Sequence, residues 1–155
     1  MMLPFTLEKG LLLEDRAVLL PWGTHWRHLA DLGSPSVTES AGQFLFDWQY
    51  PLCLGGLRTG VSARLTRQRP LRDIELHASA QTETAQESFK RVGMHLRSFF
   101  GQPAHSETSK LDGYPKEQWN MPPITIWHLV AERFGTYHVV HIRHRGQIDY
   151  ENHAV

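Results

Sequence analysis

Alternating apolar and polar residues mark several stretches of the chain as β-strands. Between positions 44 and 50 an aromatic side chain stands at every second residue, and 61–65 and 74–78 alternate in the same way. Side chains two residues apart on a strand point to the same face of the sheet. These stretches therefore predict strands with one buried face, and 11–20 predicts a strand pair or one strand broken by its central charged residues.

The clearest helix is predicted after residue 84. Thr84 and Glu87 have the spacing of a capping box, in which each side chain bonds a backbone N–H of the first turn. Apolar residues then recur at helical spacing over 89–100. Gly101 and Pro103 end the helix, because glycine accepts a left-handed conformation and proline cannot continue the helix. Two further strands are expected beyond it, at 124–132 and 136–145, joined by a turn.

A shorter helix is predicted near the N-terminus. Thr24 is a suitable N-cap, and apolar residues follow at spacings of three over 26–32. Gly33 and Pro35 end this helix in the same way that Gly101 and Pro103 end the longer one. The predicted class is therefore α+β, with antiparallel sheet and two main helices.

The two halves of the chain follow the same order of elements. Each helix end is followed by a tryptophan, Trp48 or Trp119, and then by a pair of strands. This order predicts two tandem strand-helix-strand-strand units, 1–68 and 69–146, although Gly-x-Pro after a helix is also a common stop signal. We expect a single domain of 155 residues with a loosely held tail at 147–155.

Composition limits the kinds of partner and the cellular compartment that we expect for this protein. Lys and Arg together number 16, as do Asp and Glu, so the chain lacks the basic excess typical of nucleic-acid binders. Its single cysteine, Cys53, excludes an intrachain disulfide and fits a reducing compartment. The N-terminus lacks the pattern of a signal peptide, and no apolar run approaches the roughly 20 residues that span a bilayer. We expect a cytoplasmic protein with no membrane association.

Ten histidines suggest a metal site, but their spacing argues against one. On a strand, His141 faces away from His138 and His144, which would themselves lie roughly 20 Å apart. His25 and His28 could share a face of the first helix, but the spacing supplies no third ligand. We therefore expect no metal and no cofactor.

Catalytic motifs are also lacking in the sequence. Cys53 stands between leucines without a neighbouring cation, and reactive cysteines need an electropositive setting. Asp47 is expected on the solvated face of its strand. We predict no catalytic residue and no enzymatic activity, with one alternative left open. That alternative is an enzyme whose site, for example from His25, His28, Asp47 and Cys53, forms only in three dimensions.

Arginines give the strongest local charge asymmetry. They gather around the turn between the second and third strands, at Arg58, Arg64, Arg67, Arg69 and Arg72. Such a cluster can bind RNA phosphates or an acidic protein face, although zero net charge favours a solvated hairpin. We take three of these, Arg64, Arg67 and Arg69, as candidate partner contacts, and a nucleic-acid-associated module as a second alternative function.

The stretch 102–123 shows little periodicity and is expected to be a long loop. Such loops in compact domains are usually functional or disordered. It carries Asp112, Tyr114, Glu117 and Trp119, and aromatic residues on a loop are typical interface anchors. All four are candidate partner contacts. In the alternative interpretation Trp119 begins a strand and packs inward.

A resemblance adds a specific hypothesis. The segments Pro21-Trp22-Gly23-Thr24, Leu29-x-x-Leu32-Gly33-x-Pro35 and Leu54-Gly55-Gly56-Leu57, together with Trp48, resemble bacterial immunity proteins found beside polymorphic or contact-dependent growth-inhibition toxins. The resemblance implies a non-catalytic cytosolic protein that binds a cognate toxin and blocks its active site. It identifies no contact residues and no toxin class, and the oligomeric state stays open.

Overall fold

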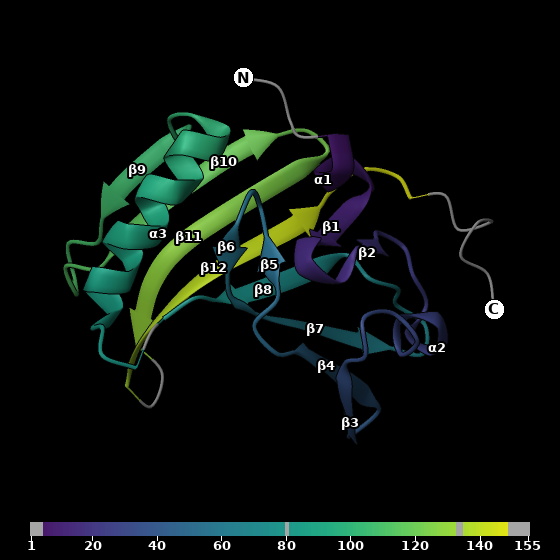
Figure 1. Ribbon diagram of the computed structural model, residues 1–155. Helices are drawn as coiled ribbons and strands as arrows, with labels where there is room; N and C mark the ends of the chain where they lie inside the picture. The colour runs from purple at the N-terminus through teal and green to yellow at the C-terminus, as the bar shows by residue number, and fades with distance from the viewer. Residues whose placement is uncertain (1–4, 80, 133–134, 149–155) are drawn as a thin grey trace.

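An eight-stranded antiparallel sheet forms the centre of the molecule in the computed structural model, which describes residues 5–79, 81–132 and 135–148 (Figure 1). Every strand pairs antiparallel with its neighbours. In spatial order the strands are β3 (Ser36–Ser40), β4 (Gln43–Trp48), β7 (Gly60–Thr66), β8 (Asp73–His77), β12 (Thr136–His144), β11 (Ile124–Glu132), β10 (Pro115–Met121) and β9 (His105–Thr108).

One face of this sheet is covered by the other elements. Helix α3 (Ala85–Phe100) lies against β11 and β12. Two hairpins lie beside it over the same face (Figure 1). The covering elements besides α3 are α1 (Phe5–Lys9), the hairpin β1 (Gly10–Leu13) and β2 (Val18–Pro21) with the 3-10 turn η1 (Glu14–Arg16), α2 (Trp26–Leu29), and the hairpin β5 (Leu52–Cys53) and β6 (Leu57–Arg58).

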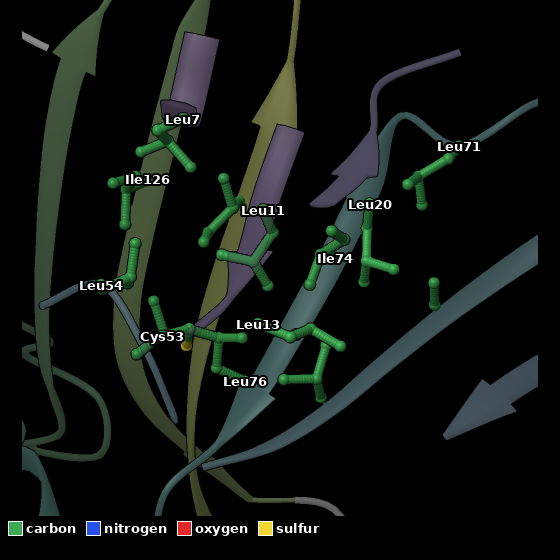
Figure 2. Close-up of a cluster of buried hydrophobic side chains, with 14 of the residues drawn as sticks. Leu7, Leu11, Leu13, Leu20, Cys53, Leu54, Leu71, Ile74, Leu76 and Ile126 are labelled. Carbon is green, nitrogen blue, oxygen red and sulfur yellow. The ribbon is translucent and has the colours of Figure 1, made fainter. Parts of the chain in front are cut away.

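The core forms between this covering layer and the sheet. Figure 2 shows leucines of the N-terminal segment, among them Leu11 and Leu13, directed toward Ile74 and Leu76 of the sheet. All four are at most 1% exposed. Burying a side chain of this size contributes about 1.5–3 kcal/mol, so the hairpin β1–β2 is held mainly by apolar contact.

The alternation predicted for the strands is confirmed. Phe44, Phe46 and Trp48 are buried on one face of β4. The strand ends at Trp48, however, and Tyr50 is 57% exposed, so its predicted burial is wrong. Residue 50 adopts a positive φ of 45°, which ends the extended conformation.

The predicted capping box of α3 is confirmed. Thr84 Oγ1 accepts from the Glu87 N–H at 3.1 Å, and Glu87 Oε1 accepts from the Thr84 N–H at 3.0 Å. Gly101 follows the helix with φ 85°, a conformation that glycine adopts without strain.

The first predicted helix is much shorter than expected. It consists of one turn, α2, whose N-cap is His25. The Thr24 hydroxyl instead donates to the Pro21 carbonyl at 2.6 Å and is not a helix cap. The residues that the structure describes therefore include one long helix, α3, in an α+β architecture with antiparallel sheet.

The two halves of the sheet mirror one another. Strands β3-β4-β7-β8 and β9-β10-β11-β12 each form a meander, and the two meanders join through β8 and β12. Trp48 Nε1 donates to the Leu32 carbonyl at 2.8 Å, and Trp119 Nε1 donates to the Gly101 carbonyl at 2.9 Å. Both tryptophans thus bind the chain just after the helix of their own half. A common origin of the units 1–68 and 69–146 stays a prediction.

The end of the chain is only partly described. Of the predicted loose tail at 147–155, Ile148 is buried with 7% exposure. Residues 149–155 lie outside the described residues.

Candidate functional site

The opposite face of the sheet carries a dense set of charged and aromatic side chains. We call it the open face, because in the described parts of the chain no helix or hairpin packs over it (Figure 1). Its central side chains come from β7, β8, β11 and β12, and are Ser62, Arg64, Asp73, Glu75, His77, Trp127, His141 and Arg143. The register of these strands, and no single sequence motif, brings them together.

Asp73 is the centre of an ion network on the open face. Its Oδ1 accepts from His141 Nε2 at 3.0 Å and from Arg143 Nε at 2.5 Å. Burial raises the pKa of Asp73, but the hydrogen bonds from His141 and Arg143 outweigh it, so the pKa lies below its ordinary value. These contacts fix three side chains in place before any partner binds.

A second group of side chains lies beside this network. His77 Nε2 is 3.5 Å from Glu75 Oε2 and 3.4 Å from Ser62 Oγ. The hydrogen bond from His77 is the main cause that lowers the pKa of Glu75. A hydrolytic relay needs one ring nitrogen for the serine and the other for the carboxylate. Here the same nitrogen meets both, so this geometry does not form a Ser-His-Glu relay.

Trp127 gives the open face an aromatic anchor. The guanidinium carbons of Arg143 and Arg145 lie 5.6 and 5.0 Å from the centre of its ring, and the His141 ring lies 5.5 Å away. Arginines at this distance are attracted to the ring face. Half-buried tryptophan and arginine are the residue types most often dominant in protein interfaces.

The arginines of the predicted cluster separate in the fold. Arg64 and Arg69 are exposed and line the same hollow of about 500 Å³, beside the turn between β7 and β8. Arg67 instead lies over Trp26 at 5.5 Å and 3.6 Å from Glu39 Oε1. It therefore belongs to the side of α2 and not to the hollow.

The other two arginines make structural contacts. Arg58 pairs with Asp15 at 3.1 Å, on the hairpin layer. Arg72 donates to the carbonyls of His144 and Gly146, each at 3.0 Å, and its position also brings it to the wall of the hollow. The sequence cluster is thus not one continuous basic surface.

The long loop expected at 102–123 is wrong, because this stretch contains β9 and β10. Glu117 and Trp119 lie on β10, and each is 2% exposed. They are therefore interior residues and are not carried further as partner contacts. The alternative interpretation is right that Trp119 lies on a strand and packs inward, but the strand begins at Pro115 and not at Trp119.

The remaining two loop candidates lie in the connection between β9 and β10. Asp112 Oδ1 accepts from the Tyr114 N–H at 2.9 Å and so stabilises the turn. The Tyr114 hydroxyl donates to Glu132 Oε2 at 3.0 Å and is 3.3 Å from Thr136 Oγ1. Tyr114 therefore ties this turn to the ends of β11 and β12, while Asp112 remains exposed.

A buried chain of titratable groups lies under α3, and no sequence pattern predicted it. His128 Nδ1 is 3.1 Å from Glu117 Oε2, and His128 Nε2 is 2.6 Å from His138 Nε2. Arg97 of α3 pairs with the other oxygen of Glu117. The one available signal was His128 itself, which interrupts the apolar alternation of β11.

The proton positions in this chain follow from its partners. A carboxylate only accepts, so His128 donates from Nδ1 to Glu117, and its Nε2 accepts from His138. Burial, with a smaller contribution from the Arg97 charge, lowers the pKa of His128 to about 3. Burial likewise lowers the pKa of His138 to about 3. Both rings are neutral at pH 7, and with exposures of 0% and 2% they are out of reach of a substrate.

The surroundings of the histidines and of Cys53 bear on metal binding and on thiol chemistry. No group of three or more His, Cys, Asp or Glu side chains that could hold a metal ion occurs in the described ranges. His25 Nε2 is 2.8 Å from the Arg67 carbonyl. Burial raises the pKa of the Cys53 thiol to about 12, with Glu14 and Asp15 adding to the effect, and this disfavours the thiolate.

Comparisons with protein-family models, curated proteins and solved structures found no match for this chain. The helices that the structure describes include none with the length and apolar character to cross a membrane.

Proposed function

We propose that this chain is a non-catalytic binding protein whose open face contacts a protein partner. The observation that carries the proposal is Trp127 with the guanidinium groups of Arg143 and Arg145 against its ring, next to the ion network of Asp73. Binding costs free energy when flexible side chains become ordered. Side chains already held by neighbours lose less, so this surface is suited to tight binding.

The partner we propose is a bacterial toxin, which the chain neutralises stoichiometrically in the cytoplasm. Support comes from the resemblance of the N-terminal segments to immunity proteins. It also comes from the open face itself, since an inhibitor needs a broad surface with anchors and needs no reaction centre. Two hollows at this part of the sheet share Arg64 and Asp73 in their walls and so lie next to one another.

Co-expression with the product of the neighbouring gene tests the proposal. We expect a stable complex and protection of cells from that product's toxicity. Trp127→Ala should weaken the complex by about 2 kcal/mol, roughly 30-fold, as for a central aromatic anchor. Lys90→Glu, on the exposed side of α3, is the matched control and should leave binding unchanged.

Two results would reject the proposal. One is the absence of both binding and protection with the wild-type chain. The other is a complex that Lys90→Glu disrupts and Trp127→Ala leaves intact, because the contact surface would then lie on the side of α3.

A further inference from the structure

The hollow beside the turn between β7 and β8 has an unusual charge balance. Its wall includes three arginines, Arg64, Arg69 and Arg72, and one carboxylate, Asp73. We call it the arginine hollow. Its volume of about 500 Å³ is large enough to receive several side chains of another molecule.

Two of these arginines form no close ion pair with any carboxylate in the described parts of the chain. Within residues 5–79, 81–132 and 135–148, neither Arg64 nor Arg69 has a carboxylate oxygen within salt-bridge distance, and both are exposed. Asp73, the acid in the wall, is already bound by His141 and Arg143. The positive charge of the hollow is therefore only partly balanced, by Asp73 in its wall and at longer range by Glu75, on which the Arg64 charge acts.

Arg72 makes part of the hollow rigid. Its guanidinium donates to two backbone carbonyls, of His144 and Gly146, at 3.0 Å each. The Thr66 hydroxyl accepts from the Arg69 N–H at 3.0 Å and fixes the backbone of the turn. Arg64 and Arg69 thus project from a defined frame, and guanidinium groups bind carboxylates in a planar, two-pronged geometry.

The surroundings favour separate carboxylates over a nucleic-acid backbone. The adjoining hollow is lined by the carboxylates of Asp73 and Glu75 as well as by Arg64 and Arg143, so charges of both signs alternate there and no continuous basic track for a row of phosphates is formed. The chain as a whole has zero formal net charge, whereas nucleic-acid binders usually show a basic excess. A protein segment can place an acidic side chain in the arginine hollow and a neutral one beside Glu75.

We propose that the arginine hollow binds an acidic segment of the partner protein, with Asp or Glu carboxylates paired to Arg64 and Arg69. This inference rests on the proposed function and adds the chemistry of the partner's contact. Trp127 and the arginine hollow would then bind two different parts of the same partner surface.

An NMR titration of the intact chain at low salt tests the inference directly. The probes are acetylated hexaglutamate, the neutral peptide hexaglutamine and the RNA hexauridylate, observed through arginine side-chain Nε–H signals. We expect hexaglutamate to bind and hexaglutamine not to bind. The double variant Arg64→Glu/Arg69→Glu should lower the hexaglutamate affinity at least about tenfold, while Lys90→Glu should change it less than about twofold.

Arg64→Gln/Arg69→Gln provides a second variant that removes the charge without adding repulsion, and circular dichroism checks that each variant is folded. The inference is overturned if hexaglutamate binds no better than hexaglutamine, or if the arginine variants leave its affinity unchanged. Hexauridylate binding as tightly, with the same dependence on the arginines, would overturn it in favour of a nucleic-acid site. A partner whose binding needs Trp127 and not the two arginines would contradict this inference alone and leave the proposed function standing.

Discussion

The buried Glu117–His128–His138 chain predicts that acid destabilises the protein. Histidines in an unfolded chain have a pKa of about 6.5, whereas burial holds the pKa of both His128 and His138 at about 3 in the fold. Between these values the unfolded chain binds protons that the folded chain does not. The free energy of unfolding therefore falls as the pH is lowered from about 6.5.

The size of the effect follows from the two pKa differences. Each histidine lowers the free energy of unfolding by a little over 1 kcal/mol per pH unit below about 6.5. For two histidines this amounts to roughly 4 kcal/mol by about pH 5. Because a domain of this kind is stable by about 5–15 kcal/mol, the loss is a large share of the total.

Urea unfolding at pH 7, 6 and 5, followed by circular dichroism, measures this dependence. His138→Gln keeps an N–H donor for His128 but removes one titrating group, so we expect it to lose a large part of the pH dependence; His128 and His144, whose pKa burial also lowers, keep the rest. His105→Gln, at an exposed position of β9, is the control and should behave as the wild type. Stability that stays constant from pH 7 to 5, or a pH dependence unchanged in His138→Gln, would refute the reasoning.

Three further predictions concern single residues. Glu117→Leu should lower the free energy of unfolding at pH 7 by about 2–3 kcal/mol, because His128 Nδ1–H loses its buried acceptor. Arg97, the other partner of Glu117, is 39% exposed and stays solvated in the variant. A urea midpoint unchanged from the wild type would contradict the predicted loss of stability. Thr84→Ala removes the capping box of α3 and should cost about 1 kcal/mol, measured in the same way; Thr84→Ser should restore most of it. Cys53 is 0% exposed and should react with a thiol reagent only after denaturation, so rapid labelling of the native protein would argue against its burial.

Elements with one buried face were predictable from the sequence. The alternation in β4, β7 and β8 and the capping box of α3 are local patterns, and each is confirmed. Strands β3 and β9 escaped prediction because all their residues are exposed, so no apolar alternation marks them. As edge strands of the sheet they depend on pairing with a neighbour.

Local sequence patterns could not predict which residues come together at the candidate site. Arg64 and Arg69 were recognised by charge, but only the pairing of β8 with β12 places Asp73 beside His141 and Arg143 on the same face. Strand order depends on contacts between residues far apart in the chain. A sequence window does not contain those contacts.

Glu117 shows most clearly what the sequence determines and what only the tertiary structure decides. In the sequence it reads as a surface residue, since an isolated carboxylate is too costly to bury. In the fold, Arg97 and His128 come from 20 and 11 residues away and supply its partners. The sequence by itself therefore determined which segments have an apolar face, whereas the tertiary structure decided which polar groups are buried together and which face of the sheet stays open.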